Sequence, residues 1–254
     1  ADGTPQGGEF LVNTTTEGFQ GNPNVSGLSD GGFVATWEDF SQTGGDTSRL
    51  AVRGQIYNAD GTPQGGEFLV NTTTEFRQED PSVTELSDGG FVVTWEDASE
   101  TGEDTSSSAV RGQAYNADGA PQGDEFLVNT TTEGFQAAPS VSGLSDGGFV
   151  ASWQDESETG EDTNFEEVRG QVYDSNGTAR GDEFLVNTTT EGFQGNPSVS
   201  GLSEGGFVAM WQESSENSDG TSDTAIRGQA YNSDGTARGD EFLVAEGFGA
   251  RPSV

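Results

Sequence analysis

An all-β fold is what the sequence predicts, and three observations support it. Apolar and polar residues alternate over short stretches, no amphipathic helical stretch is present, and one turn motif recurs every 58 residues. The motif, Ser-(Asp/Glu)-Gly-Gly-Phe-Val, begins at Ser29, Ser87, Ser145 and Ser203. A constant period of this size indicates a structural unit that the chain repeats.

Each repeat should contain four strands, and the first repeat illustrates their order. Residues 24–28 and 33–37 form a hairpin around the Gly-Gly turn, since glycine supplies the positive φ that a tight turn needs. A polar, acidic segment follows at residues 38–50. Residues 51–57 and 67–70 then form a second hairpin around an Asp-Gly turn. Four short antiparallel strands per unit are typical of a β-propeller blade, with a β-solenoid as the alternative.

The chain is therefore interpreted as one repeat domain, 1–254, of four-stranded antiparallel propeller blades. Four 58-residue repeats and partial repeats at both ends make up this domain. The expected units are a partial unit 1–20 and the repeats 21–78, 79–136, 137–194 and 195–254, the last ending in the start of a further unit.

The strand count does not balance at the ends. The Glu-Phe-Leu-Val strand occurs five times, whereas the Trp strand occurs four times. An unpaired strand recruits other chains, so we expect the terminal segments to pair with further copies of the chain. A piece cut from a longer array is the alternative.

The charge balance excludes several partners. Forty-four acidic residues face nine basic ones, the net charge is −35, and there is no His and no Cys. Such a surface is a poor partner for nucleic acid, and no apolar run is long enough for membrane insertion. Zinc sites built on Cys or His and a Ser-His-Asp triad are excluded. Self-repulsion also predicts that folding depends on cations.

The acidic loops are candidate calcium sites, because Ca²⁺ takes six to eight oxygen ligands. Each loop places several carboxylates within a short segment. The candidate ligands are Asp39, Asp46, Asp97, Glu103, Asp104, Asp155, Glu161, Asp162, Glu213 and Asp219. The alternative is a solvated acidic rim that attracts only a diffuse ion cloud.

Two further residue series recur once per repeat. One Arg and one Glu on paired strands predict a structural ion pair in each blade: Arg53 with Glu67, Arg111 with Glu125, Arg169 with Glu183, and Arg227 with Glu241. One Trp per repeat is expected to pack in the core, with sugar stacking as the alternative: Trp37, Trp95, Trp153 and Trp211.

The order of these motifs resembles the blade of sialidase-type (BNR/Asp-box-like) β-propellers. It also resembles tandem repeats of large secreted bacterial calcium-binding and adhesin-type proteins, which implies an extracellular or cell-surface location. The strict Asp-box is not matched at residues 58–62. Sialidase-like enzymes use an Arg cluster to bind a carboxylate substrate, but the identical repetition of Arg in every unit favours the ion pairs.

Near-identical repeats argue against a single catalytic centre, because such a centre needs residues that differ between blades. The sequence is therefore interpreted as a non-enzymatic structural or adhesive module stabilised by cations, with no catalytic residues. A lectin-like propeller with equivalent sites between blades, which would bind surface glycans, is the first alternative. An Asp/Glu hydrolase is the second.

Overall fold

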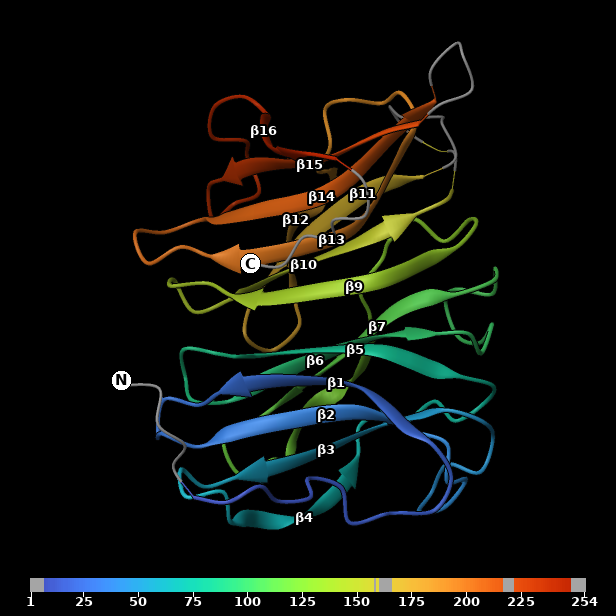
Figure 1. The fold of residues 1–254 in the computed structure, drawn as a ribbon, viewed down its shortest axis with the longest axis vertical. Coiled ribbons are helices and arrows are strands. Elements are labelled where there is room, and N and C mark those ends of the chain that lie inside the picture. Colours follow the sequence, from blue (N-terminus) through green and yellow to red (C-terminus); the bar gives the residue numbers. More distant parts are fainter. Residues whose placement is uncertain (1–6, 158, 160–165, 217–221, 248–254) are drawn as a thin grey trace.

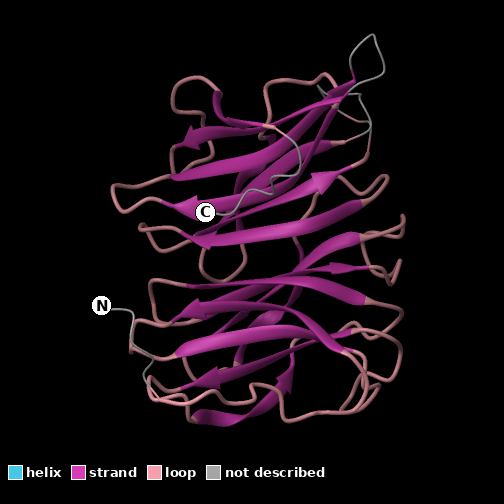
Figure 2. Cartoon of the chain, in the orientation of Figure 1, coloured by secondary structure: helices cyan, strands magenta, loops and turns pink. Residues whose placement is uncertain are grey.

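A computed structural model describes residues 7–157, 159, 166–216 and 222–247. These residues form sixteen strands, and they contain no helix. Figure 2 shows strands and loops throughout the described chain. Within these ranges there is accordingly no helix that could cross a membrane.

The strands form four sheets, one per repeat. The first contains β1 (Gln20–Gly27), β2 (Phe33–Asp39), β3 (Ala51–Tyr57) and β4 (Pro63–Leu69). The second contains β5 (Gln78–Glu85), β6 (Phe91–Asp97), β7 (Ala109–Tyr115) and β8 (Pro121–Leu127). The third contains β9 (Gln136–Gly143), β10 (Phe149–Asp155), β11 (Glu167–Tyr173) and β12 (Ala179–Leu185). The fourth contains β13 (Phe193–Gly201), β14 (Phe207–Glu216), β15 (Ser222–Tyr231) and β16 (Phe242–Glu246).

Each sheet is an antiparallel meander in chain order, as expected for a propeller blade. The innermost strands β1, β5, β9 and β13 pack against one another in that order. β1 and β13 are not among the strand pairs that pack extensively within the described residues. The four blades therefore form an arc around a common axis, with blade 1 and blade 4 at its two ends (Figure 1).

The innermost strands start earlier than the sequence suggested, because each carries a β-bulge. Strand β1 begins at Gln20, ahead of Pro23, and its register with β2 shifts between Gly21 and Asn24. The residue before each proline has a positive φ: 46° at Asn22, 51° at Asp80, 49° at Ala138 and 50° at Asn196. A bulge bends the strand and redirects side chains, here at one end of the central axis.

The hydrophobic core is divided into three clusters, each lying between neighbouring blades. Between blades 1 and 2, one side supplies Val34, Val52 and Ile56, and the other supplies Phe91 and Trp95. The two other blade interfaces repeat this arrangement. Because each cluster needs faces from two blades, a single repeat could not bury its apolar residues alone.

The Gly-Gly motif has two separate structural roles. Gly89 adopts a φ of 85°, which favours glycine. At Gly90, an added Cβ would lie 2.3 Å from the Tyr115 carbonyl oxygen, so only glycine allows this close approach of two backbones. The repeated motif therefore fixes both the turn and its packing on the neighbouring hairpin.

Candidate active site

Each repeated Arg side chain contacts at least two carboxylates, and Arg169 contacts three. Arg53 Nη1 lies 3.2 Å from Glu67 Oε1, and Arg53 Nε contacts the Asp39 carboxylate. The equivalent Arg–Glu distances are 3.4 Å for Arg111–Glu125, 3.1 Å for Arg169–Glu183 and 3.3 Å for Arg227–Glu241. The Asp partner was not predicted, since sequence reasoning assigned it to the acidic loop instead.

The proposed calcium ligands are largely engaged in hydrogen bonds within the chain. Asp97 accepts a 2.7 Å hydrogen bond from Ser99 and contacts Arg111. Asp104 accepts a 2.9 Å hydrogen bond from Asn129 Nδ2. Asp39 and Asp155 are buried and contact an Arg as Asp97 does, and Asp46 is buried and accepts from Asn71 as Asp104 does from Asn129. Glu213 contacts Arg227. Glu103 is exposed, whereas Glu161, Asp162 and Asp219 lie outside the described residues.

No group of three or more carboxylates suited to a metal ion occurs within the part of the chain that is described. Calcium binding therefore stays a prediction for this protein. The buried Asp residues have structural uses. Asp39, Asp97 and Asp155 each neutralise an Arg of the same blade. Asp46 and Asp104 each accept a hydrogen bond from a buried Asn.

The four Trp side chains are buried. Trp95, Trp153 and Trp211 are 0% exposed, and Trp37 is 4% exposed. Each of the three fully buried rings lies in a cluster between two blades. These three rings fill the core and present no face for sugar stacking, whereas Trp37 lines a hollow on the face of blade 1.

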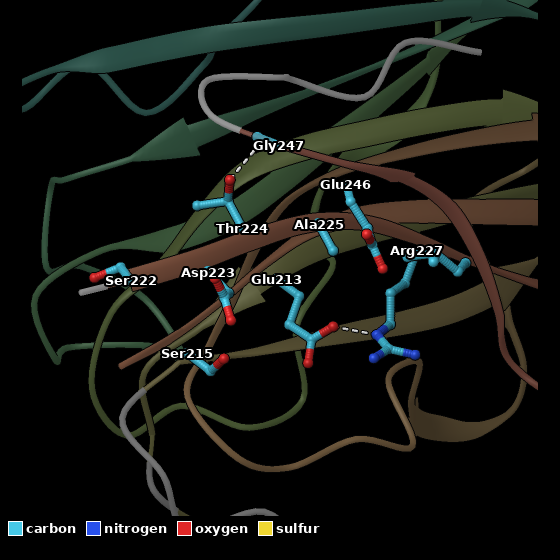
Figure 3. A pocket seen from close by; sticks show the side chains of 10 residues that line it. Glu213, Ser215, Ser222, Asp223, Thr224, Ala225, Arg227, Glu246 and Gly247 are labelled. Carbon is cyan, nitrogen blue, oxygen red and sulfur yellow. Dashed lines mark hydrogen bonds and ion pairs between the residues drawn. The ribbon is translucent and has the colours of Figure 1, made fainter. Parts of the chain in front are cut away.

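A hollow of about 420 Å³ lies at the outer part of blade 4 (Figure 3). Its lining includes Glu213 from β14 and Arg227 from β15, joined by an ion pair. Glu241 also lies 3.3 Å from Arg227. Because both carboxylates already hold the guanidinium, this hollow repeats the ion pairs of the other blades and adds no new chemistry.

A second hollow, of about 410 Å³, lies on the central axis. All four innermost strands line it with the residues around their bulges: Asn22, Asn24, Asp80, Pro81, Ser82, Ala138, Pro139, Ser140, Asn196, Pro197 and Ser198. Asp80 is the only carboxylate among these lining residues. The hollow is therefore nearly symmetric in shape but asymmetric in charge.

The second repeat departs from the others at this place. It reads Phe-Arg-Gln-Glu-Asp at residues 76–80, where the first repeat reads Gly-Phe-Gln-Gly-Asn at residues 18–22. Glu79 corresponds to Gly or Ala in the other repeats, and Asp80 to Asn or Ala. Glu79 and Asp80 were the residues in the sequence that could have indicated this site. They were missed because the four repeats were read as one common unit.

These residues assemble a carboxyl cluster across blades 1 and 2. Glu38 Oε1 accepts hydrogen bonds of 3.0 Å from the Asp80 backbone N–H and 3.1 Å from Asn22 Nδ2. Glu79 on β5 lies opposite Glu96 on β6 in the strand register. Arg77 Nη1 lies 3.1 Å from Glu79 Oε1.

Two carboxyl groups of the cluster have perturbed pKa values. Burial raises the pKa of the Glu96 carboxyl to about 8, and the neighbouring Glu79 and Asp80 carboxylates add to this rise. Burial also raises the pKa of Glu79, although Arg77 opposes the shift. At neutral pH Glu96 is therefore mostly protonated, beside an exposed Asp80 at the cavity.

Glu167 in blade 3 is a further buried carboxyl group, but its surroundings differ. It contacts the Arg169 guanidinium, which also binds Asp155 and Glu183. Burial raises the pKa of Glu167 to about 8, and the direct contact with the Arg169 guanidinium opposes this rise. We therefore assign Glu167 to the structural ion pairs and the Glu96 cluster to the candidate site.

Comparisons with known proteins support the fold. No protein-family model matches the sequence, and no curated protein matches it. Among solved structures, the chain is similar to a Penicillium chrysogenum α-L-arabinanase, with a TM-score of 0.59, 16% identity, and coverage of 91% of this chain and 68% of that one. It is also similar to a Fusarium graminearum GH93 α-L-arabinofuranosidase, with a TM-score of 0.59, 11% identity, and coverage of 88% and 66%.

A third similar structure is the Hadza microbial sialidase Hz136, with a TM-score of 0.52, 10% identity, and coverage of 90% of this chain and 59% of that one. A further structure of the Fusarium graminearum enzyme is covered to 65% of its length. At these identities the likeness establishes a β-propeller, and a sialidase is among the proteins that share it.

These neighbours overturn the prediction of a non-enzymatic structural or adhesive module. The similar structures carry the names of an arabinanase, an arabinofuranosidase and a sialidase, and none of the three is named as an adhesive module. The prediction failed because it treated the repeats as interchangeable. The second repeat differs from the others beside the axial hollow, where an asymmetric centre can form.

Proposed function

We propose that this protein is a glycoside hydrolase whose catalytic carboxyl groups are contributed by the second repeat. The observation that carries the proposal is the proximity of two unlike carboxyl groups: the buried Glu96, whose pKa is raised to about 8, and the exposed Asp80, which lines the axial hollow. Carboxyl groups whose surroundings give them different protonation states are the arrangement that glycoside hydrolysis requires.

The two roles follow from burial and exposure. Glu79 and Glu96 face each other across β5 and β6, and burial raises the pKa of Glu96 to about 8, so Glu96 holds a proton at neutral pH. That proton is the one required by the glycosidic oxygen as its bond to the anomeric carbon breaks. The Asp80 carboxylate lines the cavity and accepts a hydrogen bond from Asn22 Nδ2. It is the group that would act at the anomeric carbon, directly or through water.

Glu38 and Asn22 hold the site in place. The Glu38 carboxylate accepts a hydrogen bond from the Asp80 backbone N–H, so blade 1 fixes the bulge that directs Asp80 to the axis. The amide of Asn22 also donates to Glu38. A catalytic carboxylate on a bulge needs such support because small displacements greatly reduce the reaction rate.

Substrate classes for testing come from the similar structures. The similar structures are named as an arabinanase, an arabinofuranosidase and a sialidase. The substrates to test are therefore arabinan, aryl α-L-arabinofuranosides and sialosides. We expect the parent chain to release product from at least one of these in molar NaCl, where its charge is screened.

Three substitutions test the residue roles with little risk to the fold, because each gives the second repeat a residue that another repeat carries at the same position. They are Glu79→Ala, Asp80→Asn and Glu96→Gln, which match Ala137, Asn22 and Gln154. We expect Asp80→Asn and Glu96→Gln each to lower kcat/KM by about 10²–10⁴-fold. Asp118→Asn, on an exposed turn of the same blade, is the control and should retain parental activity.

No hydrolysis of any of these substrates by the folded parent chain would refute the proposed function. Parental activity in both Asp80→Asn and Glu96→Gln would refute this location of the active site, even if hydrolysis were observed.

A further inference from the structure

The two end blades present unequal halves of an interface that the chain makes three times internally. Val83, Val141 and Val199 are 5–6% exposed at the internal interfaces, whereas the equivalent Val25 of blade 1 is 64% exposed. At the other end of the arc, Phe242 and Leu243 of β16 are exposed. Among the described residues, no blade therefore covers this face of blade 1, and β16 covers no further blade.

The internal interfaces show what these faces accept. In blade 2, Phe91 and Tyr115 stack at a ring-centroid distance of 4.9 Å, and Phe68 from the last strand of blade 1 packs on them, 5.5 Å from Tyr115. Phe126 and Phe184 make the same contact with blades 3 and 4. Phe242 is the next member of this series in the sequence.

Blade 1 carries the same aromatic pair. Phe33 and Tyr57 stack at 4.9 Å, and we call this pair the Phe33–Tyr57 seat. Phe10 from the N-terminal segment occupies the seat, with its ring 5.6 Å from Tyr57. The Tyr57 hydroxyl donates to the Val12 carbonyl, as the Tyr115 hydroxyl donates to the Val70 carbonyl.

The N-terminal segment thus imitates the last strand of a preceding blade. Glu67 Oε2 accepts a 2.8 Å hydrogen bond from the Thr14 backbone N–H, just as Glu125 accepts one of 2.7 Å from Thr72. Residues 9–12, however, are not a strand of any sheet in the described chain. They cover the seat without the three other strands of a blade.

The inner part of the blade 1 face stays open beside this segment. A hollow of about 470 Å³ there is lined by Pro23, Val25, Ala35 and Trp37, with Val12 at its edge. At the internal interfaces the corresponding space is filled by the neighbouring blade, through residues such as Val34 and Ile56. An apolar hollow of this kind is a docking surface for a blade of the same repeat.

We propose that blade 4 of a second copy of this chain docks on blade 1, with its Phe242 displacing Phe10 from the Phe33–Tyr57 seat. Residues 9–12 are then an intramolecular cap that competes with the second copy for one site. The occupant is a second copy because β16 carries the same Phe-Leu pair that β4, β8 and β12 carry at their ends, where the Phe contacts the next blade.

Hydrogen bonds between neighbouring innermost strands also have free-end equivalents on blades 1 and 4. The Glu85 backbone N–H donates to Ser26 Oγ at 3.1 Å, and the Gly201 backbone N–H donates to Ser142 Oγ at 2.9 Å. The next hydroxyl in this series is Ser200 on β13, and the backbone amide that would match it is Gly27 on β1. Head-to-tail docking would bring these two groups together in the geometry of the internal interfaces.

Two phenylalanine substitutions should have opposite effects on association. Phe10→Ala weakens the cap and should raise the association constant at least tenfold, whereas Phe242→Ala should lower it by a similar factor. The measurement is sedimentation velocity in molar NaCl, where the −35 net charge is screened. Phe76→Ala, an exposed phenylalanine on the connection between blades 1 and 2, is the control and should leave association unchanged.

A mixing experiment tests the head-to-tail direction. The double variant Phe10→Ala/Phe242→Ala has an open seat and lacks the phenylalanine that fills it, so it should not self-associate but should form a 1:1 complex with the parent chain. If Phe10→Ala fails to melt cooperatively, Phe10→Leu replaces it. Changes in the same direction for both single variants, no change in either, or no mixed complex would overturn the proposal.

Discussion

The backbone N–H of Asp80 donates a 3.0 Å hydrogen bond to Glu38 Oε1, which joins the second blade to the first beside the axial hollow. The same Glu38 oxygen receives Asn22 Nδ2 from the bulge of β1. One carboxylate therefore holds two neighbouring bulges, and the blade that carries the candidate catalytic groups depends on its neighbour for their position.

Loss of this contact should affect the reaction more than the fold. Glu38 is half-buried, and Glu38→Gln gives the first repeat the residue found at Gln154 and Gln212. We expect kcat to fall about 10-fold or more with a melting temperature close to that of the parent, because the Asp80 bulge loses a charge-assisted hydrogen bond. An unchanged kcat would show that Glu38 does not position Asp80.

Truncation of a buried Trp should destabilise the whole arc. Trp95 is fully buried in the cluster between blades 1 and 2. Trp95→Ala should lower the free energy of unfolding by about 3–5 kcal/mol, as measured by urea denaturation. A parental denaturation midpoint in this variant would contradict the assignment of the ring to the core.

Removal of one partner from a buried ion pair should also be costly. Asp97→Asn leaves the largely buried Arg111 without the carboxylate at its Nε, although Glu125 remains at 3.4 Å. We expect a loss of about 3 kcal/mol of stability. The control is Arg77→Ala, because the Arg77 side chain is 46% exposed and surface pairs contribute about 0–1 kcal/mol. Equal losses of stability in both variants would show that the buried Asp97–Arg111 pair contributes no more than the exposed Arg77–Glu79 pair.

The fold could be predicted from the sequence because its determinants repeat. Gly89, Gly90 and Trp95 recur at the same positions in every unit, and each imposes a local geometry that one repeat is enough to reveal. The bulge at Asp80 was not predicted, since a positive φ before proline is set by packing around the axis. The pairing of Arg111 with Asp97 was also missed, because it joins residues from β6 and β7 whose register the sequence leaves open.

The candidate site was harder to predict for the opposite reason, because it depends on a departure from the repeat. Glu79 and Asp80 were visible as unusual residues, but their significance required the location of the axis. The raised pKa of Glu96 follows from burial and from neighbouring carboxylates, which the sequence does not place.

Stability should depend on pH through Glu96. Its pKa is about 8 in the folded chain and near 4.5 when unfolded, so the folded state binds more protons between these values. Stability from this group is therefore fully present below about pH 4.5 and is lost as the pH rises through about 8. The melting temperature of Glu96→Gln should fall less steeply than that of the parent from pH 5 to 8.5. Parallel curves would contradict the raised pKa.

Salt should stabilise the protein strongly. With a net charge of −35 the compact state repels itself, and screening relieves this repulsion. We expect the melting temperature to rise continuously between 10 mM and 2 M NaCl. Calcium at matched ionic strength tests the separate prediction of specific calcium sites, and a saturable extra increase abolished by EDTA would support them. A salt-independent melting temperature would refute the electrostatic explanation.

We propose that the buried Glu96 carboxyl group and the exposed Asp80 carboxylate hydrolyse a glycosidic bond. The pH dependence of kcat/KM, for the substrate that the parent chain cleaves, tests this mechanism most directly. We predict that kcat/KM of the parent falls as the pH rises through about 8, because Glu96 then loses its proton. We also predict that Glu96→Gln lacks this basic limb and has a much lower maximum. A parental profile that is level through pH 9, or a Glu96→Gln profile that matches it, would contradict the mechanism.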